Sequence, residues 1–152
     1  RMGGCETGGA PQLTATAELA WFGSRGWGCR ASAGYAGRRY VEPMALRRTD
    51  RIAGQGGITH EAFEAFTRQE RLADAFTLDA SLFKSFYFDR SRLTAALMLR
   101  NLLGDADTPY GGYESLRVRR IRPGDDTLYT PHATRCTYAW PRSFYLTISY
   151  RF

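Results

Sequence analysis

The residues best suited to chemistry in this chain of 152 residues are the aromatic and basic side chains of segment 110–120. Two tyrosines flank a pair of glycines there, and a carboxylate and several arginines follow. Aromatic rings beside permissive glycines can stack on a ligand, and guanidinium groups can bind carboxylate or phosphate. The candidate ligand-binding residues are Tyr110, Tyr113, Glu114, Arg117 and Arg119. The alternative, which we favour, is a loop hairpin with solvated arginines.

Other residues that could support catalysis or metal binding lack the spacing that such sites need. His60 and His132 lie far apart, without a nucleophile or metal-ligand pattern near either. Cys5, Cys29 and Cys136 are an odd number of cysteines without metal-site or redox spacing. The glycine clusters are not followed by Lys-Ser or Lys-Thr, as a phosphate loop would require. We therefore predict no catalytic residue, metal site or cofactor, and no enzyme.

The net charge of +6 is distributed along the chain rather than gathered in one block. Segment 38–74 holds seven arginines and six acids, a mixture typical of a solvated loop, so we predict no nucleic-acid partner. The longest purely apolar run is 95–99, far short of the roughly 18 residues that a membrane-spanning helix needs. The sequence thus argues against a helical membrane protein.

Five stretches alternate apolar and polar residues with period two, which predicts half-buried β-strands. In the clearest one, every second residue from Phe144 to Phe152 is apolar. The expected strands span about 12–22, 26–37, 76–88, 92–102 and 143–152. Such lengths suit tilted strands that cross a bilayer, which need about 9 to 11 residues, better than soluble sheets, whose strands have about 5 or 6. We expect an all-β fold, an antiparallel up-and-down segment of a transmembrane β-barrel.

The connections between these strands alternate between short turns and the long loops 38–75 and 103–142. Outer-membrane barrels have short periplasmic turns and long extracellular loops, which predicts a periplasmic C-terminus. Interfacial aromatic girdles are also typical of such barrels. The girdle residues expected beside the short turns are Trp21, Trp27, Phe86 and Phe88. In the first long loop we expect a short helix that begins near Thr59.

The two faces of the expected strands differ in polarity, with one exception on the apolar face. That exception is Lys84, whose stem can lie along the apolar band while its ammonium reaches the interface. The opposite face carries charged residues that could contact a plug or a substrate, although we favour a structural role in a wet lumen. They are Glu18, Arg30, Asp79, Arg92, Arg100 and Arg151.

Four segments of the chain resemble, in order and spacing, the C-terminal portion of TonB-dependent outer-membrane receptors, particularly the type with an N-terminal carboxypeptidase-regulatory-like domain. They are YVEPMALRRTDRI, RQERLADAFTLDASLFKSFYF, LRNLLGDADTPYGGYESLRVRRI and YAWPRSFYLTISYRF. The resemblance implies a barrel of about 22 strands, of which this chain would supply the last five. It also implies an N-terminal plug and a signal peptide that are absent from this chain.

The resemblance further implies energy-coupled uptake of a scarce nutrient such as a metal chelate, cobalamin, oligosaccharide or peptide. The implied partners are outer-membrane lipid, the nutrient ligand, and the TonB complex through the missing N-terminal region. The terminal strand would be the signal for the barrel-assembly machinery of a Gram-negative outer membrane, through Phe144, Ile148, Tyr150 and Phe152.

Two other classes remain open from the sequence. One is a smaller outer-membrane barrel that acts as a porin or adhesin, and the other is a soluble β-sandwich binding module. Five strands alone cannot close a cylinder, so for the barrel we expect an open, curved sheet with two unpaired edges and an exposed apolar face.

Overall fold

The computed structural model describes residues 4–49, 59–115, 118–120 and 129–152, and these fall into two compact units. The sheet unit comprises Leu13–Gly37, Asp74–Thr108 and Tyr138–Phe152. The loop unit comprises Arg1–Gln12, Arg38–Ala73 and Pro109–Thr137.

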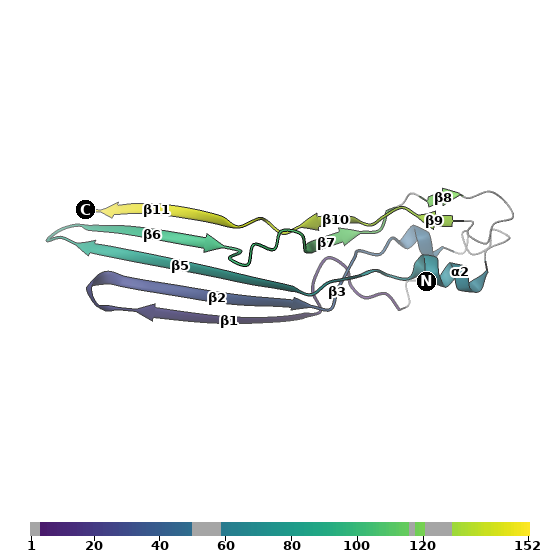
Figure 1. Ribbon diagram of the computed structural model, residues 1–152, viewed down its shortest axis with the longest axis horizontal. Coiled ribbons are helices and arrows are strands. Elements are labelled where there is room, and N and C mark those ends of the chain that lie inside the picture. The colour runs from purple at the N-terminus through teal and green to yellow at the C-terminus, as the bar shows by residue number, and fades with distance from the viewer. Residues whose placement is uncertain (1–3, 50–58, 116–117, 121–128) are drawn as a thin grey trace. The chain divides into compact units, whose positions relative to one another are not determined.

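The sheet unit is built on one antiparallel sheet of five long strands in the order β1-β2-β5-β6-β11 (Figure 1). The strands are β1 (Leu13–Phe22), β2 (Trp27–Gly37), β5 (Ala75–Tyr87), β6 (Arg92–Arg100) and β11 (Ser143–Arg151). Each long strand pairs with the long strand before it in sequence, and among the described residues β1 and β11 each have a single neighbour. The sheet is therefore open, and the prediction of an all-β, mainly antiparallel fold is confirmed.

Two short connections join strands at one end of this sheet. The first contains the 3-10 turn η1 (Ser24–Gly26), in which Arg25 and Gly26 have positive φ of 60° and 80°. A Cβ at position 26 would lie 2.3 Å from the Ser85 carbonyl oxygen, so glycine lets the turn approach β5 closely. In the second connection, the Phe88 amide donates to the Ser91 carbonyl at 2.8 Å. The other end of the sheet holds the strand ends from which the long connections depart.

The strand register separates the side chains into two faces, because residues directly opposite one another in an antiparallel pair share a face. Leu19 lies opposite Ala31, and Ala31 lies opposite Ala80. On the next strands, Ala80 lies opposite Leu99, and Leu99 lies opposite Phe144. The period-two pattern predicted from each strand alone thus becomes one continuous apolar face.

The loop unit contains shorter elements, and the long loops carry more regular structure than we expected. They are β3 (Arg39–Tyr40), η2 (Ala45–Arg48), α2 (His60–Thr67), β4 (Arg71–Leu72), β7 (Pro109–Tyr113), β8 (Val118–Arg120), β9 (Tyr129–Pro131) and β10 (Arg135–Tyr138). The short strands pair as β3 with β4, β7 with β10 and β8 with β9. The predicted helix is confirmed by α2.

A small core lies at the centre of the loop unit. Val41 is fully buried, and Phe66 of α2 and Leu72 of β4 are nearly so. Gln69 connects this core to the N-terminal segment, because its amide nitrogen donates to the carbonyls of Val41 at 2.8 Å and Glu6 at 2.9 Å. Among the described side chains of the helix, Phe66 is the apolar residue that is buried in this core.

Candidate functional site

The largest candidate surface is the apolar face of the five-stranded sheet. Its large side chains are exposed on both edge strands, where Leu19 is 80% exposed and Ile148 is 67% exposed. On β6, between them, Leu93, Leu97 and Leu99 are half-buried. A soluble domain rarely leaves a contiguous apolar patch of more than a few hundred Å² uncovered. The face is therefore built to be covered by an apolar phase or by another apolar surface.

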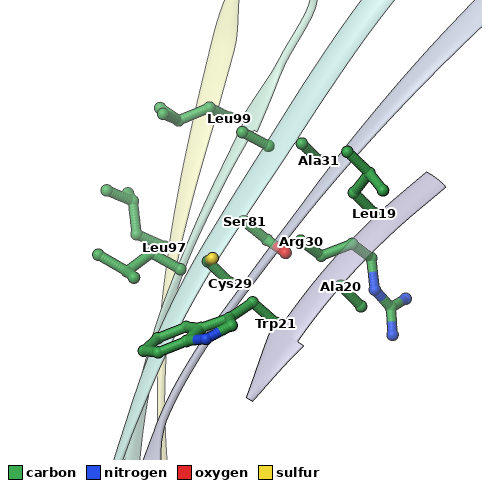
Figure 2. Close-up of a pocket in the computed structure, with 11 residues that line it drawn as sticks. Leu19, Ala20, Trp21, Cys29, Arg30, Ala31, Ser81, Leu97 and Leu99 are labelled. Atoms are coloured by element: carbon green, nitrogen blue, oxygen red, sulfur yellow. The ribbon is translucent and has the colours of Figure 1, made fainter. Parts of the chain in front are cut away.

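A groove of about 550 Å³ crosses this face (Figure 2). Three of its lining residues have small side chains, namely Cys29, Ala31 and Ala80. Cys29 and Ala31 are successive residues of β2 on this face, and Ala80 of β5 lies opposite Ala31. Larger apolar side chains line it on either side, namely Leu19, Trp21, Leu82, Leu97 and Leu99. In Figure 2 Trp21 lies beside Cys29, its partner across β1 and β2, and the Arg30 side chain extends away from Leu97 and Leu99. The volume lies within the range of small-molecule sites, about 300 to 1,000 Å³.

Lys84 carries the one charge among the strand residues of this face. Its Nζ donates a hydrogen bond to the Arg25 carbonyl in the neighbouring turn. The same nitrogen lies 4.9 Å from the centroid of the Trp27 ring and 5.4 Å from that of Phe86. Contacts of this kind between a cation and aromatic rings are favourable. The ammonium is thus directed toward the turn.

The expected girdle residues lie at the same end of the sheet as the short turns. Trp21, Trp27 and Phe86 belong to the apolar face near the turns, and Phe88 lies within the second connection, exposed. At the opposite end, the Tyr35 hydroxyl donates to the Asp74 carboxylate at 2.6 Å. Aromatic side chains with polar partners thus stand at both ends of the face.

The opposite face of the sheet is polar, and three of its six charged residues have partners within the sheet unit. Arg30 forms an ion pair with Glu18 at 3.3 Å. The Asp79 carboxylate accepts a hydrogen bond from the backbone amide of Asn101 at 2.9 Å. A hollow of about 210 Å³ lies on this face. It is lined by Glu18, Arg30, Ser32, Asp79, Ala80, Ser81, Met98 and Arg100. At the turn end, Arg92 lies directly opposite Arg151. The face is therefore charged, and its structural role in a lumen stays a prediction.

In the loop unit the candidate tyrosines are exposed, as ligand contact would require. Tyr110 and Tyr113 are both exposed in β7, and the guanidinium carbon of Arg39 lies 5.4 Å from the Tyr110 ring centroid. The glycines between them have a structural function, because a Cβ at Gly112 would lie 2.9 Å from the Arg135 carbonyl oxygen. The tyrosines remain candidates, whereas Gly112 serves close strand approach.

Glu114 has a different environment from the one predicted, since it is only 2% exposed. Arg48 donates to its Oε2 at 2.6 Å and to its Oε1 at 2.7 Å, and the Met44 amide donates to Oε2 at 2.8 Å. Arg47 lies at 3.9 Å from Oε2 and donates to the Ser115 carbonyl at 2.8 Å. A ligand would reach the Glu114 carboxylate only by breaking this cluster, so its observed contacts are internal.

Electrostatics within this cluster favour the charged carboxylate. Burial alone would raise the pKa of Glu114, but hydrogen bonds from Arg48 and the Met44 amide, with the charges of both arginines, lower it below its usual value. The hydrogen bond to Glu114 raises the pKa of Arg48, whereas burial lowers that of Arg47. The pair Glu114–Arg48 is therefore ionised at neutral pH.

The remaining predicted site residues divide between those that the structure describes and those that it does not. Arg117 lies outside the described residues, and Arg119 is described only through its backbone in β8. Phe144, Ile148 and Tyr150 lie on the apolar face of β11, and Phe152 follows the strand with nearly its whole side chain exposed. The sequence does not single out the buried arginines Arg47 and Arg48, because nothing in the local sequence links them to Glu114, which lies 66 residues beyond Arg48.

Among the described residues there is no group of three or more His, Cys, Asp or Glu that could hold a metal ion. None of the helices in the described part of the chain has the length and apolar character to span a membrane. No protein-family model, curated protein or solved structure matches the chain.

Proposed function

We propose that this chain supplies the C-terminal strands of the barrel of a TonB-dependent outer-membrane receptor, which takes up a scarce nutrient in an energy-coupled manner. The observation that carries the proposal is the sheet with one continuous, exposed apolar face and one polar, charged face. In a barrel wall the first face contacts lipid and the second lines the lumen. The motif resemblance described above supplies the receptor class.

The strand lengths and the connections support a barrel wall over a soluble sheet. The five long strands have 9 to 13 residues, near the about 9 to 11 that span a bilayer. The short connections share one end of the sheet, and the long ones depart from the other. This alternation favours a periplasmic position for the turns and for Phe152, and an extracellular one for the long loops.

The edges of the sheet also favour this proposal. In the described part of the chain β1 and β11 have no second neighbour, and an unpaired edge cannot lie within a bilayer. In the proposal, strands from the remainder of the protein pair with both edges. The exposed residues of β11, with Phe152, would then serve the barrel-assembly machinery before closure.

Two experiments on the full-length protein test the proposal in sequence. The first experiment fractionates the cells and compares the gel migration of boiled and unboiled protein. If the protein is a barrel, we expect it in the outer membrane, and we expect the unboiled protein to migrate faster. Recovery in the soluble fraction without detergent would refute it.

Uptake assays in a strain without the gene, and in the same strain complemented, test the receptor class. We expect uptake of one nutrient among ferric chelates, cobalamin, oligosaccharides and peptides to require the gene and TonB. Uptake of small solutes that needs neither TonB nor metabolic energy would identify a porin instead.

A further inference from the structure

We propose that the apolar groove and Lys84 together form a binding site for one anionic phospholipid, with an acyl chain in the groove and the phosphate at the ammonium. The inference rests on the proposed function, since lipid reaches this face only if the sheet lies in a membrane. It goes further, because a barrel wall requires no preference for any particular lipid.

The groove and the cation are adjacent on the same face of the sheet. Leu82 lines the groove, and Lys84 is the next residue of β5 on that face. Lys84 lies opposite Trp27 on one side and Ala95 on the other. These two residues follow the groove residues Cys29 and Leu97 toward the turns. The charge therefore lies where the groove ends, as the head group of an amphiphile requires.

The ammonium retains capacity for an anion in addition to its contact with the protein. A lysine ammonium has three donors, and the Arg25 carbonyl accepts one hydrogen bond from Lys84. No carboxylate within 4.0 Å forms an ion pair with it in the described part of the chain. The rings of Trp27 and Phe86 hold the cation to one position. An unneutralised, oriented cation beside an apolar groove is complementary to a phosphate that carries an acyl chain.

The local backbone fixes this arrangement rather than leaving the lysine free to move. Gly26 allows η1 to approach β5, which brings the Arg25 carbonyl within reach of Lys84. A lysine that merely extends to the interface needs neither this carbonyl nor a groove. A lysine of that kind also attracts anionic lipid by its charge alone. A site goes further, because it places an acyl chain of the anionic lipid in the groove, beside Trp27.

The short-turn end is the periplasmic end in the proposed orientation, where the lipids of the membrane are phospholipids. The test uses the full-length protein in phosphatidylcholine vesicles that contain dibrominated phosphatidylcholine or dibrominated phosphatidylglycerol. Bromine on an acyl chain quenches nearby tryptophan. The fluorescence of Trp27 is obtained by subtracting the fluorescence of the Trp27→Phe variant from that of the unaltered protein, in vesicles of each composition.

We expect brominated phosphatidylglycerol to bind near Trp27 about fivefold more tightly than the choline lipid, as about 1 kcal/mol per cation near anionic lipid implies. The preference should vanish in Lys84→Gln and persist in Lys84→Arg. Arg92→Gln, which removes a cation from the polar face at the same end, is the matched control and should leave the preference unchanged.

Two distinct failures separate this inference from the proposed function. Equal quenching by both lipids, or a preference that survives in Lys84→Gln, overturns the phospholipid site while the membrane position of the face stands. An absence of quenching by either lipid removes the membrane position and the site together.

Discussion

Arg48 binds Glu114 with both terminal nitrogens, at 2.6 Å and 2.7 Å, across 66 residues of sequence. The same guanidinium donates to the Thr67 carbonyl at 2.7 Å, at the end of α2. Three segments of the loop unit thus meet at one buried ion pair. Bidentate pairs of this kind are geometrically specific, and breaking one in the interior is costly because it leaves an uncompensated charge. The loop unit therefore depends on this contact for its conformation.

Glu114→Gln should destabilise the loop unit locally by about 3 kcal/mol, the lower end of the cost of breaking a buried ion pair. Hydrogen exchange at the Met44 amide, which donates to Glu114, reports the loss directly. We expect faster exchange there and unchanged exchange in β5. Glu64→Gln is the control, because Glu64 pairs with His60 on the exposed surface of α2. Unchanged protection of Met44 in Glu114→Gln would contradict the structural role.

The same contact should make the loop unit sensitive to acid. The Arg48 and Met44 hydrogen bonds hold the pKa of Glu114 in the folded protein below its ordinary value of 4.5. Its contribution to stability is therefore complete above that value and is lost as the pH falls through the folded-state pKa. Hydrogen exchange at the Met44 amide, corrected for its intrinsic pH dependence, should become faster at acid pH in the unaltered protein. The Glu114→Gln variant should not show this acid-dependent change. Equal acid sensitivity in both proteins would refute this.

Charge on the apolar face should impair membrane assembly, and charge on the polar face should not. Ile148→Arg places a guanidinium toward lipid, at a cost of up to about 2 to 4 kcal/mol near the bilayer midplane. Thr147→Arg, one residue away on the other face of β11, is the matched control. We expect less heat-modifiable protein in the membrane for the first variant only. Equal yields from the two variants would argue against lipid on this face.

The exposed tyrosines should contribute to nutrient binding if the loop unit recognises the ligand. Tyr110→Ala and Tyr113→Ala should each weaken binding by about 1 kcal/mol or more, near the additional contribution of an aromatic contact. Binding of the imported nutrient to cells measures this. Tyr138→Ala, at another exposed tyrosine, controls for general loss of aromatic surface. Unchanged binding in both variants would leave the tyrosines with a structural role only.

The sequence predicted the sheet well because its signal is local. The alternation of Leu93 to Leu99 and of Phe144 to Tyr150 determines which residues share a face, and the strands need only pair in register. The observed bounds of the five long strands differ from the expected ones by at most two residues. Lys84 was also recognised as an interruption, although its contact with Arg25 depends on the turn.

The loop unit could not be predicted to the same depth. Its strands have two to five residues, too few for an alternation to be visible. Glu114 was grouped with its sequence neighbours as a ligand-binding residue, whereas its partners Arg47 and Arg48 come from another segment. No periodic pattern connects residues so distant, and a carboxylate beside tyrosines has the same appearance whether it faces solvent or a buried arginine.

The most direct test of the membrane-spanning sheet is a cysteine scan along β11 in the full-length protein. Cys5, Cys29 and Cys136 are first replaced by alanine, and single cysteines at positions 144 to 149 carry an environment-sensitive fluorophore. The proposed barrel predicts quenching by spin-labelled lipid at Phe144, Leu146 and Ile148, and no quenching at Tyr145, Thr147 and Ser149. Equal quenching at all six positions, or at none, would contradict a wall with one face in lipid.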